Sequence, residues 1–169
     1  TQLILSKLNK MKRTGTTTIG AISSYSYDLD ACVKSPLNKV FFCEVIGTKG
    51  DMIDTLFADF KDRLNIARKH KSANFIPAIA IHSPYSVHPF LVRETLKLAR
   101  EENLPVTSHF LESQEEFEWL HKDEGAFVEF FKNFFILLVN NNPSIRIFFT
   151  GSCRTSNCSM CRLHCIRYG

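Results

Sequence analysis

The sequence predicts an α/β fold in which helices cover a parallel sheet. Three observations predict it: strand-like segments alternate with segments of helical period, the strand-like segments are apolar on both faces, and four of them occur. Strands buried on both faces are typical of parallel sheets, because the crossover helices cover them. These patterns leave two architectures open, a doubly wound sheet and part of a (β/α)8 barrel, since a complete barrel needs about 200 residues or more.

The chain begins with a predicted helix, and four strands follow along the sequence. Ile4, Leu8 and Met11 recur at helical spacing, and Gly15 is placed to end this helix as a C-cap glycine. The strand segments are rich in β-branched and aromatic residues, which favour a pleated, half-buried surface. The four strands are expected at residues 16–22, 40–46, 75–81 and 105–109.

Three further helices separate and follow the later strands. Residues 51–70 predict a helix with Asp51 as N-cap or first-turn acid. Residues 88–103 predict a second, with Pro89 in its first turn. Residues 114–135 predict an aromatic amphipathic helix interrupted by one glycine. The expected inner faces consist of Ile53, Leu56, Phe57, Phe60, Leu64 and Ala67 in the first of these helices and Val92, Leu96 and Ala99 in the second.

Composition indicates a globular protein without nucleic-acid or membrane partners. Hydrophobic residues make up 44% and charged residues 22%, and no apolar run approaches the ~20 residues of a membrane span. The net charge of +4 lies entirely on residues 136–169, while residues 1–135 carry equal numbers of basic and acidic side chains and no basic stripe. A cytoplasmic protein is expected. The chain opens on Thr1 rather than methionine, so we expect its natural start to lie upstream.

Residues 136–169 form a cysteine-rich basic tail that differs in composition from the body. Lysine and both acids disappear together near Phe135–Ile136, while four of the six cysteines follow. One interpretation is a zinc site, because thiolates and an imidazole at short spacings can surround the ion. The other, which the abrupt change favours, is translation out of frame. The candidate zinc ligands are Cys153, Cys158, Cys161, His164 and Cys165.

Polar residues follow two of the predicted strands. His82 comes directly after Ile81, and His109 and Glu112 end the last strand segment. Working residues of parallel α/β folds lie where strands end, and an imidazole there can bind a metal, move a proton or contact a substrate. A single such histidine is more often structural, but two on neighbouring strands with one nearby glutamate favour a site. The phosphate-binding motifs G-x-G-x-x-G and G-x-x-x-x-G-K-[ST] and the nucleophile elbow G-x-S-x-G are absent.

The motifs around these residues resemble the amidohydrolase superfamily. His82 opens the sequence His-Ser-Pro-Tyr-Ser, and His109 opens His-Phe-Leu-Glu-Ser, with a helix between them. These are similar to H-[AS]-P-Y-[ST] and H-x-x-E-[ST] in the branch of chlorohydrolases and nucleoside-type deaminases. The resemblance covers about residues 1–135 and implies a partial (β/α)8 barrel of about four parallel strands with covering helices.

The resemblance also implies a role for each residue. His109 would be a ligand of a catalytic divalent metal, zinc or iron, and Glu112 would carry protons between water and the substrate ring. His82 would contact a small, purine-nucleoside-like substrate. The implied reaction is metal-dependent hydrolysis of a non-peptide C–N bond.

The chain departs from the family pattern at both ends. The family's H-x-H metal pair belongs to a strand before Thr1, and a histidine and an aspartate from later strands are also missing. Because a catalytic metal needs about three protein ligands, we expect this chain alone to be an inactive fragment. The alternative from another class is a non-catalytic α/β protein whose tail binds zinc.

Overall fold

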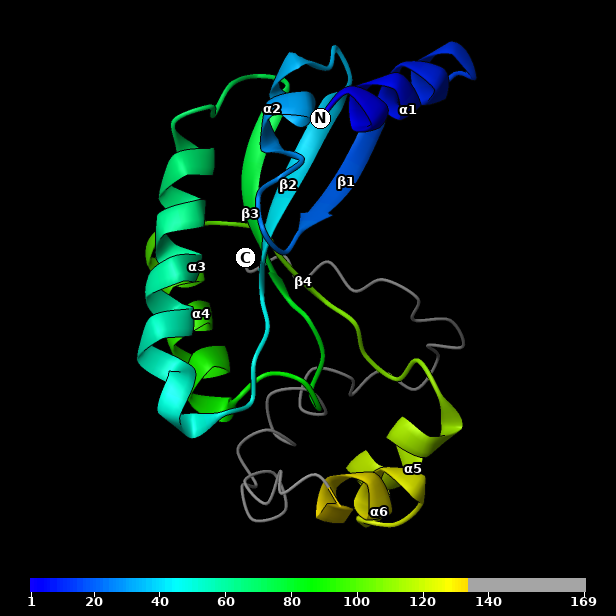
Figure 1. Cartoon of the computed structure of the whole chain (residues 1–169), viewed down its shortest axis with the longest axis vertical. Coiled ribbons are helices and arrows are strands. Elements are labelled where there is room, and N and C mark those ends of the chain that lie inside the picture. Colours follow the sequence, from blue (N-terminus) through cyan, green and yellow to red (C-terminus); the bar gives the residue numbers. More distant parts are fainter. Residues whose placement is uncertain (134–169) are drawn as a thin grey trace.

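The computed structural model of the chain describes residues 1–133 and contains one parallel sheet with the strand order β1-β2-β3-β4 (Figure 1). The strands are β1 (Thr18–Ser23), β2 (Asn38–Val45), β3 (Phe75–Ile81) and β4 (Val106–Ser108). The helices are α1 (Gln2–Arg13), α2 (Leu29–Lys34), the 3-10 turn η1 (Gly50–Met52), α3 (Ile53–Arg68), α4 (Pro89–Glu101), α5 (Gln114–Lys122) and α6 (Ala126–Asn133).

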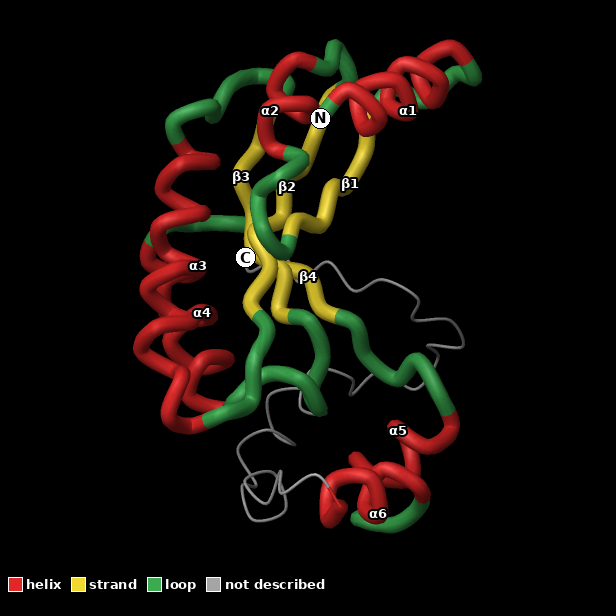
Figure 2. The backbone as a smooth tube through the Cα atoms, in the orientation of Figure 1, coloured by secondary structure: helices red, strands yellow, loops and turns green. Residues whose placement is uncertain are grey.

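The predicted architecture is confirmed. All three strand pairs are parallel, and each strand lies beside the next one in the sequence, as in an arc of a (β/α)8 barrel (Figure 2). The strand boundaries differ from the predicted ones by two residues at most. In the described part of the chain, no helix has the length and apolar character needed to cross a membrane.

The two faces of the sheet carry different cores. Because side chains alternate between the faces of a strand, Phe41 packs on the face that α3 and α4 cover, whereas Phe42 packs with Ala78 and Ala80 on the opposite face (Figure 1). We call this opposite side the inner face. The helix-side core takes in Phe60, Leu64 and Ala67 of α3 and Val92, Leu96 and Ala99 of α4. The predicted inner faces of both helices are therefore confirmed.

Helix α1 ends at a Schellman motif. Gly15 has φ +97°, its N–H donates to the carbonyl of Lys12, and the N–H of Thr16 donates to the carbonyl of Met11. These are the two hydrogen bonds that define the motif, and glycine adopts the left-handed conformation without a steric penalty. The predicted C-cap glycine is confirmed.

Three local features differ from the sequence prediction. Helix α2 and the turn η1 were not expected, because six or three residues are too short to show a helical period. Asp51 lies in η1, and Asp54 is the acid of the first turn of α3 instead. The interruption predicted at Gly125 of the helix 114–135 is confirmed, since Gly125 has φ +90° and separates α5 from α6, but the break begins two residues earlier, where Asp123 at φ +57° ends α5.

The last two helices lie beyond the carboxyl ends of the strands (Figure 1). Trp119 and Leu120 of α5 are buried in a cluster separate from the main core. Side chains from the turns after β3 and β4, including Tyr85 and Leu111, pack against this cluster. The cluster therefore supports the turns on which the predicted site residues are carried.

Gly47 joins the turns that follow β2 and β3, and Gly47→Ala is expected to destabilise the fold. Its N–H donates to the carbonyl of Ser86, and its carbonyl accepts from His88. Gly47 has φ +136°, and an added Cβ would lie 2.4 Å from Cδ1 of Leu56. The backbone strain alone should cost about 1–3 kcal/mol, measured as the change in free energy of unfolding in urea.

Gly15→Ala is the matched control for this substitution. Gly15 also has a positive φ, but a Cβ there would meet nothing within 4 Å. Its loss of stability should therefore be smaller and reflect the backbone alone. Equal losses at both glycines would show that the contact with Leu56 does not matter.

Candidate active site

Two histidines follow neighbouring strands at the carboxyl end of the sheet. Ile81 of β3 pairs in register with Ser108 of β4, and His82 and His109 come directly after them. The N–H of His109 donates to the carbonyl of His82 at 3.0 Å, so the parallel ladder continues through both residues. Their ring centroids are 5.6 Å apart. The prediction that both imidazoles lie at the same end of the sheet is confirmed.

The carboxylate of Glu112 reaches back to this pair. Its Oε1 lies 3.2 Å from Nδ1 of His109, and the two side chains are 50% and 42% exposed, so water has access to the contact. Because Nδ1 faces the carboxylate, Nε2 is the ring nitrogen that points away from Glu112. The structure thus brings the three predicted residues together, since His109 contacts both Glu112 and His82.

Serines of its own turn hold the imidazole of His82. Nδ1 lies 2.6 Å from Oγ of Ser86 and 3.1 Å from Oγ of Ser83, and the two hydroxyl oxygens are 2.5 Å apart. Ser83 is completely buried. Hydroxyl groups can donate or accept, so this network suits either tautomer of the ring. The His-Ser-Pro-Tyr-Ser motif therefore folds into a turn that orients its own histidine.

A buried glutamate that the sequence analysis did not single out holds the turn after His109. Glu116, in the first turn of α5, is 1% exposed, and its Oε2 accepts a hydrogen bond of 2.8 Å from the N–H of Glu112. Burial raises the pKa of the Glu116 carboxyl, and the N–H groups of Glu112 and Leu111 act in the opposite direction. The sequence signal was a capping box, Ser113 followed three residues later by Glu116.

A second unpredicted carboxylate lies at the end of β2. Glu44 is 5% exposed, and its Oε2 accepts a hydrogen bond of 2.5 Å from the hydroxyl of Ser24. Glu44 pairs in register with Ala80, two residues before His82, so it belongs to the inner face. Arg63 of α3 donates to the carbonyl of Glu44 at 3.0 Å and thereby fixes the backbone there. In the sequence, the signal for Glu44 was its position at the end of a predicted strand.

The remaining described histidines have structural surroundings. His88 is the N-cap of α4 and accepts from the N–H of Phe90 at 3.2 Å, while burial lowers its pKa. His121 stacks on Phe117 with ring centroids 4.1 Å apart, and His70 is exposed. None of these contacts involves His82 or His109.

The described residues do not assemble a complete metal site. Within residues 1–133, no three His, Cys, Asp or Glu side chains lie close enough together to hold a metal ion. Burial raises the pKa of the Cys32 and Cys43 thiols to about 11, so both stay protonated near neutral pH. The alternative zinc ligands Cys153, Cys158, Cys161, His164 and Cys165 lie outside the described residues.

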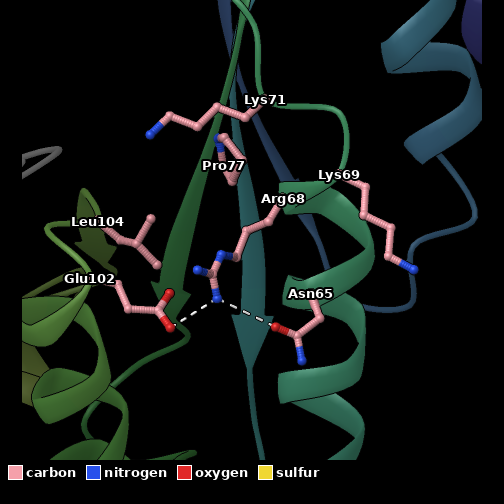
Figure 3. A pocket seen from close by; sticks show the side chains of 7 residues that line it. All are labelled: Asn65, Arg68, Lys69, Lys71, Pro77, Glu102 and Leu104. Carbon is pink, nitrogen blue, oxygen red and sulfur yellow. Dashed lines mark hydrogen bonds and ion pairs between the residues drawn. The ribbon is translucent and has the colours of Figure 1, made fainter.

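A cavity of about 610 Å³ lies at the other end of the sheet (Figure 3). It lies beside the start of β3, and the guanidinium of Arg68 donates to Glu102 at 2.8 Å and to Asn65 at 3.4 Å. The lining residues are Asn65, Arg68, Lys69, Lys71, Pro77, Glu102 and Leu104. Catalytic residues of parallel α/β folds lie at the opposite, carboxyl end of the sheet, so this cavity is not part of the histidine site.

The chain has an arc of parallel strands with two imidazoles and a carboxylate at its carboxyl edge. This is the arrangement of (β/α)-barrel enzymes, whose catalytic residues lie at that edge. Residues 2–134 match the Amidohydrolase family, and the chain belongs to that family. The family named from the two histidine motifs is thereby confirmed.

Two curated relatives are similar to most of the described residues. The aminodeoxyfutalosine deaminase of a Nitratiruptor species is 47% identical over 127 residues, which are 75% of this chain and 31% of that protein. The adenosine deaminase of Helicobacter pylori is 31% identical over 133 residues, 78% of this chain and 32% of that protein. The chain thus spans about a third of the length of these relatives.

Solved structures of one related enzyme have the same fold. The Helicobacter pylori aminofutalosine deaminase superposes with a TM-score of 0.72 at 28% identity, over 79% of this chain and 33% of that one. Its complex with methylthio-coformycin gives a TM-score of 0.70 at 28% identity, over 82% and 33% of the two chains.

Proposed function

We propose that residues 1–135 belong to a metal-dependent deaminase that hydrolyses a C–N bond of an adenine-type nucleoside related to aminodeoxyfutalosine. We call this enzyme, with its in-frame C-terminal half in place of residues 136–169, the full-length protein. The observation that carries the proposal is the 3.2 Å contact between Glu112 and His109 beside His82 at the carboxyl edge of the sheet. The names of both curated relatives and the methylthio-coformycin bound in the solved complex support the substrate class.

The donor chemistry of the site fits a divalent metal. An imidazole nitrogen is a common ligand of zinc and of iron. We assign His109, which lies beside His82 and Glu112, as one ligand of that metal. A bound cation of this kind supplies hydroxide at neutral pH by lowering the pKa of water.

The two other residues would act on the substrate. Glu112 is half exposed and in contact with His109, so its carboxylate can take a proton from water and deliver it to the ring nitrogen or the leaving amine. His82, whose Nδ1 is held by Ser83 and Ser86, would place its other nitrogen against the substrate. On this proposal the protein serves an alternative route to menaquinone and works in the cytoplasm.

The agreement between composition and family match supports a boundary near residue 135. The match ends at residue 134, next to the point where lysine and acids disappear. We propose that residues 1–135 belong to the barrel domain and that residues 136–169 are out-of-frame sequence. Sequencing the gene across codon 136 tests this. If the genes of independent isolates continue in one reading frame from codon 135 into the tail, the proposal is contradicted.

Ammonia release by the full-length protein tests the proposed function. Aminodeoxyfutalosine and adenosine are offered separately, before and after removal of metal by a chelator. Activity is expected on at least one of them, lost on chelation and restored by zinc or iron. Residues 1–169 alone are expected to be inactive, because we assign them one ligand where about three are needed. Undiminished turnover by metal-free protein, or no turnover of either nucleoside, would overturn the proposal.

A further inference from the structure

We propose that Glu116 is a positioning residue, whose buried carboxylate holds the turn that aims Glu112 at His109. The inference rests on the proposed function, since it explains how the placement of the proposed proton carrier is maintained. It adds a residue that lies outside the two histidine motifs and that the sequence spacing marks only as part of a capping box.

The first support is the contrast between the two glutamates. Glu112 has a half-exposed side chain, so its own contacts with the protein do little to fix it. Its backbone N–H, however, donates at 2.8 Å to Oε2 of Glu116, which is 1% exposed and lies on a regular helix. The position of Glu112 is therefore set through its main chain by a buried partner on a helix.

The second support is the backbone of the turn itself. Leu111 has φ +55°, a left-handed conformation that is rare for a bulky side chain and persists only when the surrounding structure imposes it. Leu111 packs against Trp119 and Leu120, and the next N–H is taken by Glu116. Packing on one side and a hydrogen bond on the other thus hold a conformation that the chain would not keep alone.

The third support is that helix capping does not account for the geometry. In a capping box the glutamate bonds the N–H of the N-cap residue itself, which is Ser113 here. Glu116 instead bonds the N–H of Glu112, one residue earlier, and its Oε1 is buried with no hydrogen-bond partner among the described residues. A buried unpaired oxygen lowers stability. The arrangement lowers stability while it fixes Glu112. Positioning of Glu112 in the site therefore explains it better than capping of the helix.

Three variants of the full-length protein separate positioning from capping. Glu116→Ala removes the acceptor for the Glu112 N–H. Glu116→Gln keeps one side-chain oxygen for that N–H and serves as the conservative rescue. Ser113→Ala removes the hydroxyl that caps the same helix by accepting from the Glu116 N–H at 3.2 Å, but it leaves the Glu112 contact in place.

The kinetic result expected is a loss of kcat in Glu116→Ala of roughly 10–100-fold with little change in KM, because misplacement of a reacting group by about 1 Å can cost that much. Glu116→Gln and Ser113→Ala should stay within about threefold of the parent, since a lost cap weakens a helix end without moving the reacting group. Equal losses in Glu116→Ala and Ser113→Ala would overturn the inference in favour of simple capping.

Hydrogen exchange of the Glu112 amide provides a readout that does not depend on activity. Exchange should accelerate in Glu116→Ala and stay slow in Glu116→Gln and Ser113→Ala. An unchanged rate in Glu116→Ala would overturn the inference, whatever the kinetics. If instead the amide responds as expected but the parent protein deaminates neither nucleoside, the proposed function fails while the positioning contact stands.

Discussion

Glu112→Gln is expected to lower kcat of the full-length protein by roughly 100-fold or more, because general acid–base catalysis contributes about 10²–10⁴-fold. Glutamine keeps the size and shape of the side chain and can still contact Nδ1 of His109, but it cannot carry a proton. KM should change little, since the substrate contact assigned to His82 remains. Initial rates of ammonia release at saturating and limiting substrate measure both constants.

Glu115→Gln is the matched control for this substitution. Glu115 is an exposed acid in the first turn of α5, three residues from Glu112 in sequence, and removing its charge alters the same surface. Its variant should keep the parent kcat. If Glu112→Gln were as active as Glu115→Gln, the assignment of Glu112 as proton carrier would be wrong.

His109→Ala should deplete the protein of metal. Loss of an outer-shell partner already weakens metal binding about 10–100-fold, and loss of a direct ligand should weaken it further. The purified variant is therefore expected to carry far less than one equivalent of metal, measured by elemental analysis, and to show no activity. Addition of excess zinc should restore little of it.

His82→Ala is the control for His109→Ala. Both histidines follow neighbouring strands and their rings are 5.6 Å apart, so the two variants disturb the sheet similarly. His82 is assigned to the substrate, and its variant should retain metal while KM rises. Equal metal loss in both variants would show that the site had collapsed, and full metal content in His109→Ala would remove the proposed ligand.

Most of the fold was predictable because each strand is apolar on both faces and each long helix has one apolar face. Lys39 shows where that pattern fails: it is buried at the start of β2, and its ammonium donates to the carbonyl of Ser35 at 2.7 Å. The predicted strand begins at residue 40, whereas β2 begins at Asn38. Whether a polar side chain finds a buried partner depends on tertiary contacts that local patterns do not contain.

The candidate site was predictable only in part, for a related reason. His82, His109 and Glu112 follow strand ends, and a parallel register brings strand ends together. Glu116 is one of several acids at the start of α5, and only the direction of its hydrogen bond to Glu112 distinguishes it. Glu44 gains its place from the pairing of β2 with its neighbours, which depends on residues far apart in the sequence.

The hydrogen bond from the His109 N–H to the His82 carbonyl has a consequence for how such a protein can evolve. The distance between the two rings follows from the spacing of neighbouring strands, so point mutations elsewhere can accumulate without altering it. A one-residue insertion or deletion inside β4 would instead turn His109 to the helix side of the sheet and bring Ser108 or Phe110 to its place. In the full-length protein, substitutions elsewhere therefore leave the spacing of the two rings intact, whereas a change in the length of β4 would remove His109 from the site.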